Sequence, residues 1–168
     1  MSDLSQGILI VDFGSQTTLL IARRIREMGV YSEVWPCTDE RLHTPPGCLG
    51  IVLSGGPSSV ADIDSPRLAT ALLDHGVPVL GICYGMQLIT EHFGGRVAPT
   101  ETREYGRNVL SHTDTSLLQG VPENTVVWMS HGDSAVETPA PIRVTGRSES
   151  GLPACIEIDG HEIYGVQF

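Results

Sequence analysis

The segment Gly81-Ile82-Cys83-Tyr84-Gly85 has the residue types and the spacing of a nucleophile elbow with cysteine as the nucleophile. An apolar run precedes it and a helical pattern follows it, as such a turn requires. Small residues on both sides of Cys83 let the backbone make a tight, strained turn. We expect the thiol to project from a strand end at the start of a helix, whose dipole favours the thiolate. A buried cysteine in an ordinary glycine turn is the alternative.

A second glycine-rich segment, Ser54-Gly55-Gly56-Pro57, also follows an apolar run. Because the carboxyl ends of parallel strands meet at one edge of a sheet, we expect this loop to lie near Cys83. The backbone N–H groups of Gly56 and Tyr84 are then the candidate donors of an oxyanion hole. Pro57 has no N–H and fixes the turn. An ordinary Gly-Gly-Pro turn is the alternative.

Apolar runs and helical periodicities alternate over the first 95 or so residues. They predict strands over 8–14, 30–35, 50–54 and 77–82, and helices over 17–28, 66–75 and 84–93. Such alternation is typical of βαβ units with right-handed crossovers. Short strand-like runs then follow within 109–110, 126–129, 142–145, 154–158 and 162–168. We therefore expect one α/β domain over residues 1–168, with three α/β/α layers and a mostly parallel central sheet that carries an antiparallel extension.

Two polar positions leave alternatives open. Asp12 follows the first predicted strand, and we expect it to cap the following turn, with Ser15 as the helix N-cap. Arg103 and Glu104 form either a surface ion pair or part of a docking face. The last predicted strand, over 162–168, is either a short edge strand or the point where the chain is incomplete.

The composition excludes several classes of function. The chain has 168 residues and a formal net charge of −10, and all ten of its basic residues are arginine. Without lysine it has no P-loop lysine and no Schiff-base lysine. The acidic balance argues against nucleic acid and anionic membranes as partners. The four cysteines show no metal-ligand spacing, and no targeting or membrane-spanning segment is visible, so we expect a cytoplasmic protein with reduced thiols and no metal.

Five motifs in order give the chain a specific resemblance: Val11-Asp12-Phe13-Gly14-Ser15-Gln16, Ser54-Gly55-Gly56-Pro57, Gly81-Ile82-Cys83-Tyr84-Gly85-Met86-Gln87, Arg103-Glu104-Tyr105-Gly106 and Trp128-Met129-Ser130-His131-Gly132-Asp133. Together they resemble the class I (triad) glutamine amidotransferases, which have a flavodoxin-like fold. The first and last motifs favour the amidotransferase domains of the GMP synthase family in particular. The resemblance covers essentially the whole chain.

The resemblance implies a role for each matching residue. Cys83 is the nucleophile that forms a thioester with the side chain of L-glutamine, and the N–H groups of Gly56 and Tyr84 form the oxyanion hole. The substrate glutamine is held by Gln87, Ser130, His131, Gly132 and Asp133. The ammonia passes to a synthetase domain, which uses ATP and Mg²⁺ to convert XMP to GMP in purine biosynthesis. The amidotransferase domain itself needs no cofactor, and a homodimer forms through the part outside this chain.

The chain departs from the family pattern at its end. The family completes its triad with a His-Pro-Glu segment directly after a strand like Gly165-Val166-Gln167-Phe168, where this sequence stops. We therefore expect an incomplete amidotransferase domain that is nearly inactive by itself. A non-catalytic glutamine-binding partner module and another cysteine-elbow α/β hydrolase are the alternatives. We expect the histidines outside the motifs to be exposed or hydrogen-bonded. Within the last motif, we expect Trp128 and Met129 to belong to the core and not to bind a ligand.

Overall fold

A computed structural model describes residues 4–43, 47–113 and 115–168. A nine-stranded sheet crosses this part of the chain in the order β2-β1-β3-β4-β9-β8-β7-β5-β6. Its strands are β1 (Gly7–Asp12), β2 (Tyr31–Pro36), β3 (Gly50–Leu53), β4 (Val79–Ile82), β5 (Arg96–His112), β6 (Thr125–Glu137), β7 (Ile142–Arg147), β8 (Pro153–Ile158) and β9 (Ile163–Val166). The helices are α1 (Thr18–Glu27) and α2 (Tyr84–His92), with short 3₁₀ helices η1 (Leu4–Gln6), η2 (Glu40–His43) and η3 (Thr70–Leu72).

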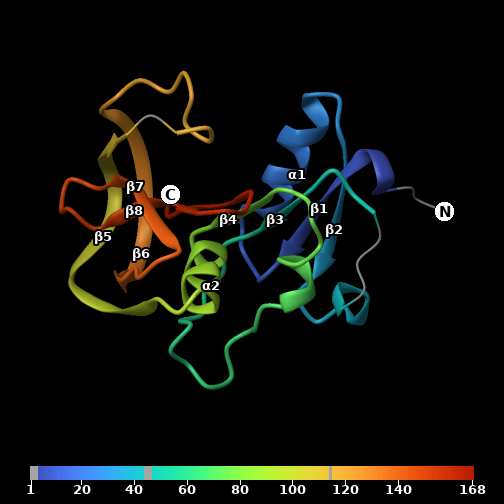
Figure 1. Ribbon diagram of the computed structural model, residues 1–168, viewed down its shortest axis with the longest axis horizontal. Helices are drawn as coiled ribbons and strands as arrows, with labels where there is room; N and C mark the ends of the chain where they lie inside the picture. The colour runs from blue at the N-terminus through green and yellow to red at the C-terminus, as the bar shows by residue number, and fades with distance from the viewer. Residues whose placement is uncertain (1–3, 44–46, 114) are drawn as a thin grey trace.

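The sheet has a parallel half and an antiparallel half (Figure 1). Strands β2, β1, β3, β4 and β9 pair in parallel, and β9, β8, β7, β5 and β6 pair antiparallel. The predicted α/β fold with an antiparallel extension is therefore confirmed, although the extension is as large as the parallel part. The C-terminal strand β9 lies between β4 and β8, so it is not the edge strand that the sequence allowed.

The two helices cover opposite faces of the parallel strands (Figure 1). On one face Leu9 and Leu53 pack with Ile89 of α2 in the largest apolar cluster. On the other face Ile10 packs with Ala22 of α1 in a smaller cluster. Successive residues of β1 thus enter two different clusters, which explains why its sequence is continuously apolar. The predicted three-layer arrangement is confirmed.

The predicted helix over 66–75 is wrong, because only the 3₁₀ turn η3 forms there. The carbonyl of Pro66 accepts a hydrogen bond from the Tyr84 hydroxyl at 2.7 Å. The guanidinium of Arg67 donates back to the carbonyls of Val60 and Asp62. A distant hydroxyl thus takes the Pro66 carbonyl in place of a helical N–H, so tertiary structure overrides the local preference for a helix.

The turn after β1 is held by Asp12, as predicted. Its Oδ1 accepts hydrogen bonds from the Gly14 N–H at 2.9 Å and the Thr18 hydroxyl at 2.7 Å. The predicted N-cap at Ser15 is wrong, since α1 begins after Thr17. The Ser15 hydroxyl instead accepts from the Thr17 N–H at 3.1 Å and stabilises the turn itself. No helix in the described part of the chain has the length and apolar character to cross a membrane.

Candidate active site

Cys83 occupies a strained turn between β4 and α2. Its φ of 50° and ψ of −105° lie where a residue with a side chain is rarely found. The Cys83 N–H donates to the carbonyl of Val166, at the end of β9, at 2.8 Å. Its own carbonyl accepts from the Gln87 N–H at 3.1 Å, which begins α2. The predicted elbow is therefore present, and backbone hydrogen bonds hold it on both sides.

The glycines that flank Cys83 are required by close packing. A Cβ atom on Gly81 would lie 2.6 Å from the carbonyl of Gly85 and from Cδ1 of Ile89. A Cβ atom on Gly85 would collide with the carbonyl oxygen of Leu53. Only glycine at these two positions lets α2 begin directly against the ends of β3 and β4. The spacing that suggested an elbow in the sequence thus has a steric origin.

Ser54 joins the end of β3 to the elbow. Its buried hydroxyl accepts from the Phe13 N–H at 3.0 Å and donates to the Gly55 carbonyl at 2.8 Å. Its backbone carbonyl accepts from the Gly85 N–H at 3.1 Å. A Cβ atom on Gly55 would lie 3.5 Å from the Cβ of Cys83. The predicted proximity of the second glycine loop to the nucleophile is confirmed.

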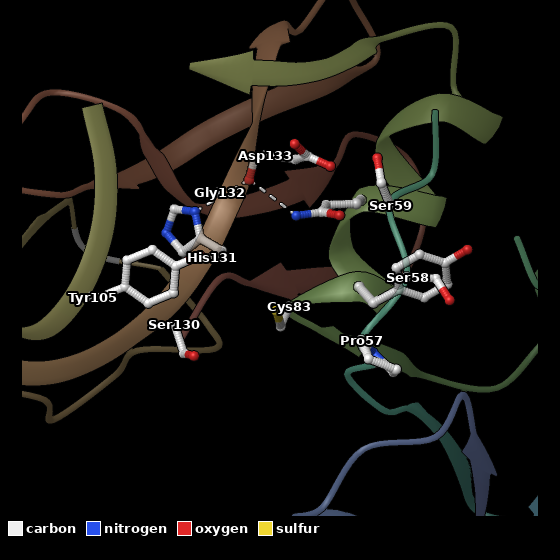
Figure 2. A pocket seen from close by; sticks show the side chains of 12 residues that line it. Pro57, Ser58, Ser59, Cys83, Tyr105, Ser130, His131, Gly132 and Asp133 are labelled. Carbon is white, nitrogen blue, oxygen red and sulfur yellow. Dashed lines mark hydrogen bonds between the residues drawn. The ribbon is translucent and has the colours of Figure 1, made fainter. Parts of the chain in front are cut away.

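A cavity of about 310 Å³ opens over the sulfur. It is lined by Gly56, Pro57, Ser58, Ser59, Cys83, Tyr84, Gln87, Tyr105, Ser130, His131, Gly132 and Asp133. Every site residue expected from the sequence is among them. Figure 2 shows Cys83 between the Pro57–Ser59 loop on one side and Tyr105, Ser130 and His131 on the other. The parallel half thus supplies the thiol, and the antiparallel half supplies the facing wall.

The Cys83 thiol has a raised pKa, because burial disfavours the charged thiolate. The Tyr84 N–H and the Gln167 side chain favour the thiolate and lower the pKa, against the effect of burial. Burial is the larger effect, so the pKa of the thiol stays above its usual value even though the first N–H of α2 favours the thiolate. The Tyr84 N–H is thus close enough to donate at the reacting centre. The Gly56 N–H has no backbone acceptor among the described residues, so it is also available.

Gln167 is a site residue that the sequence analysis missed. It is 1 % exposed, its side chain lowers the pKa of the Cys83 thiol, and its Nε2 makes no other hydrogen bond among the described residues. Its Oε1 lies 3.5 Å from Nε2 of Gln87. A glutamine inside an otherwise apolar strand segment was the only available signal, and that signal does not specify which group the amide faces.

The Gln87 side chain ties the elbow helix to the opposite wall. Its Nε2 donates to the backbone carbonyl of Asp133 at 3.1 Å. The Nδ1 atom of His131 lies at the same distance, 3.1 Å, from that carbonyl (Figure 2, dashed lines). The Asp133 carbonyl is therefore fixed by one donor from α2 and one from β6.

His131 is buried, and its surroundings lower the pKa of the imidazole chiefly through desolvation. Its Nε2 lies 3.1 Å from Oε2 of Glu104, which is also buried. Since one ring nitrogen faces Asp133 and the other faces Glu104, neither is free to take a proton from Cys83. The expected surface role of Glu104 beside Arg103 is wrong, because strand alternation turns Glu104 inward.

Two further expectations concern the residues around the site. Met129 is buried as predicted, but Trp128 is 71 % exposed, because it lies on the outer face of β6. Among the described residues, no group of three His, Cys, Asp or Glu side chains is arranged to hold a metal ion. All four cysteines are free thiols.

Residues 9–168 match the family model of the class I glutamine amidotransferases. The match covers nearly the whole chain, and the chain therefore belongs to the class I glutamine amidotransferase family.

Individual relatives give a narrower likeness. The chain is 49% identical over 167 residues to a GMP synthase [glutamine-hydrolyzing] of Listeria innocua, covering 97% of this chain and 32% of that protein. It is 44% identical over 171 residues to the GMP synthase of Symbiobacterium thermophilum, covering 100% of this chain and 33% of that protein. The chain thus spans about a third of the length of the curated relatives it matches.

Solved structures share the fold. A proposed GMP synthase subunit from Thermoplasma acidophilum superposes with a TM-score of 0.82 and 27% identity, over 99% of this chain and 85% of that one. A glutamine amidotransferase from Thermotoga maritima superposes with a TM-score of 0.80 and 20% identity, over 98% of this chain and 75% of that one. The second likeness supports the fold alone.

Proposed function

We propose that this chain is the glutaminase part of a glutamine-hydrolysing GMP synthase. The observation that carries the proposal is the Cys83 thiol, held at positive φ at the start of α2 and open to a cavity of about 310 Å³. Cavities of this size suit small ligands. Family membership, and the identity to GMP synthases over nearly the whole chain, support glutamine as that ligand.

In the proposed reaction the Cys83 sulfur attacks the side-chain amide carbon of L-glutamine. A carbon–sulfur bond forms, the carbon–nitrogen bond breaks, and the proton lost by the thiol passes to the leaving nitrogen, which departs as ammonia. Water then hydrolyses the thioester and releases glutamate and the thiol. The N–H groups of Gly56 and Tyr84 would stabilise the oxyanion in both steps, and losing such a donor typically costs about 10²–10³-fold in rate.

The amino-acid end of glutamine would lie against the strand segment Ser130–Asp133. Gln87 and Asp133 would stand on either side of it, since both line the cavity. The carboxylate of Asp133 suits the α-ammonium group of the substrate. We propose binding roles for Gln87, Ser130, His131, Gly132 and Asp133 on these grounds.

Catalysis also needs a proton acceptor for Cys83, because burial raises the pKa of the thiol. The one imidazole that lines the cavity, on His131, is engaged by Glu104 and the Asp133 carbonyl. We therefore expect the chain of residues 1–168 to be a poor glutaminase by itself.

The ammonia would serve a synthetase that aminates XMP to GMP with ATP and Mg²⁺. The greater length of the GMP synthase relatives supports such a partner domain. Free thiols at all four cysteines favour a reducing compartment, and we propose the cytoplasm. We also propose that the whole protein forms a homodimer through its synthetase part.

Protection of Cys83 from iodoacetamide tests the glutamine site without requiring a catalytic base. At pH 9 enough thiolate forms for alkylation to be followed by mass spectrometry. We expect saturating L-glutamine to slow Cys83 alkylation at least about 10-fold, whereas D-glutamine and L-asparagine have little effect. Half-buried Cys37 is the internal control and should react at an unchanged rate. Equal alkylation of Cys83 with and without L-glutamine would contradict the proposal and favour another cysteine hydrolase.

A further inference from the structure

A line of buried polar contacts runs from the turn after β7 to the cavity. The Glu149 N–H donates to Oδ1 of Asn108 at 2.9 Å, and Nδ2 of Asn108 donates to Oε1 of Glu104 at 3.2 Å. The other oxygen of Glu104 lies 3.1 Å from Nε2 of His131, and Nδ1 of His131 lies 3.1 Å from the Asp133 carbonyl. The proposed reaction uses the end of this line at the cavity and leaves Glu104 without a role.

Glu104 and His131 meet where the pairing of β5 and β6 resumes. Pro99 pairs with Asp133, and the next pair is Glu104 with His131, so four residues of β5 lie opposite Gly132 alone. Such a bulge weakens the register, which the following pair must restore. Both side chains of that pair point inward and are only 2–3 % exposed. The first firm cross-strand contact after the bulge is therefore a buried carboxylate–imidazole pair.

The contacts of the ring determine where its protons are. The Asp133 carbonyl can only accept a hydrogen bond, so Nδ1 of His131 carries a hydrogen. The Nε2 atom faces a carboxylate oxygen at ion-pair distance, although a ring N–H does not point straight at that oxygen. With the Asp133 carbonyl at one ring nitrogen and Glu104 at the other, the two contacts together fix the orientation of the ring.

The Asp133 carbonyl accepts one hydrogen bond from Nδ1 of His131 and a second from Nε2 of Gln87. Gln87 lies one turn into the helix that begins after Cys83, while Asp133 lies on the facing wall. The two donors together set the separation of the wall from the elbow helix. A shift of His131 would release one of the two restraints.

We propose that Glu104 is a positioning residue for the glutamine pocket: it orients His131 so that His131 and Gln87 together fix the Asp133 carbonyl and the width of the cavity. The identity of the ligand rests on the proposed function. Glu104 itself does not line the cavity, so it acts on the ligand only through His131. The thiol is held by the other half of the sheet and should keep its reactivity when Glu104 is changed.

The test compares Glu104→Gln with Glu101→Gln, which makes the same change at an exposed position of the same strand. The readouts are the L-glutamine concentration that half-protects Cys83 from iodoacetamide and the unprotected alkylation rate, both well below the melting temperature. We expect Glu104→Gln to raise the half-protecting concentration at least about 10-fold and to leave the unprotected rate within about twofold. Glu101→Gln should change neither. A folded Glu104→Gln chain with an unchanged half-protecting concentration would overturn the proposal.

A second readout does not depend on glutamine. The ¹⁵N chemical shifts of the His131 ring should report a hydrogen on Nδ1, and should move in Glu104→Gln but not in Glu101→Gln. If the parent chain showed no glutamine protection, the proposed function would fail. Unchanged ring shifts in Glu104→Gln would separately overturn the positioning role.

Should Glu104→Gln not fold, Glu104→Asp keeps the charge on a shorter side chain and should weaken protection about threefold. No change in that folded variant would also overturn the proposal.

Discussion

The two halves of the sheet position the site by different physical means. In the parallel half the nucleophile is held by backbone geometry. Glycines at 81 and 85 allow a close approach, and the N–H groups of Cys83 and Gly85 donate to the carbonyls of Val166 and Ser54. In the antiparallel half the facing wall is held by side chains, through the Glu104–His131 pair. Close packing allows the Cys83 turn only one backbone arrangement. The Glu104–His131 pair instead favours one register of β5 against β6 over the others.

The same contrast appears in what each half buries. The cluster under α2 is apolar, with Leu9, Leu53 and Ile89 among its members. The inner face of the β5–β6 hairpin combines apolar residues with the buried side chains of Glu104 and His131. Buried polar groups contribute little net stability but are costly when one partner is lost. Substitutions in the two halves should therefore lower the free energy of unfolding by different amounts and for different physical reasons.

The largest effect is expected from Gly85→Ala in the parallel half. The new methyl group would collide with the Leu53 carbonyl, and neither backbone segment can move without displacing β3 or α2. We expect a loss of at least about 3 kcal/mol in the free energy of unfolding, measured by urea denaturation. The control is Gly47→Ala, where a methyl group meets nothing within 4 Å, and its loss should stay within about 0.5 kcal/mol. Equal losses in the two variants would refute the steric origin of the elbow.

A smaller effect is expected from Asn108→Ala in the antiparallel half. This change leaves the Glu149 N–H without its acceptor and removes one hydrogen bond to Glu104. We expect a loss of about 1–3 kcal/mol in unfolding free energy. The alkylation rate of Cys83 should not change, and the exposed variant Gln119→Ala serves as the control. A large change in that rate would show that the two halves are not held independently.

The smallest effect concerns the ionisation of Cys83. Burial raises its pKa above the usual 9.0, so alkylation by iodoacetamide should accelerate with pH up to a midpoint above that value. Gln167→Leu removes a donor that favours the thiolate, so it should raise the pKa further and slow alkylation at pH 8 by roughly threefold. Alkylation of Cys37 in the same sample should be unaffected. A faster reaction in the variant would show that Gln167 does not stabilise the thiolate.

The elbow could be predicted from the sequence because its cause is local. Gly81, Cys83 and Gly85 stand at a fixed spacing between an apolar run and a helical pattern, and the structure places them in the expected turn. The Gly56 loop was also predictable, because strands with continuous apolar runs belong to a parallel sheet whose ends meet. The alternation of β1 between two clusters follows from the same pattern.

The rest depends on contacts between residues far apart in the chain. Glu104 beside an arginine resembles a surface residue until the pairing with β6 places it opposite His131. Gln167 acquires its role only because β9 lies next to β4, which no local pattern indicates. The expected helix after Pro66 failed for the same reason, since the Tyr84 hydroxyl takes the carbonyl of Pro66.

The most direct measurement for the central claim is a crystal structure of the chain with Cys83 alkylated by a glutamine-shaped chloromethyl ketone. We predict that the methylene carbon beside the ketone is bonded to the sulfur, with the ketone oxygen within hydrogen-bond distance of the Gly56 and Tyr84 N–H groups. The amino-acid end should lie between Gln87 and Asp133. An oxygen turned toward solvent, or an amino-acid end outside the cavity, would contradict the assignment of this cavity as the glutamine site.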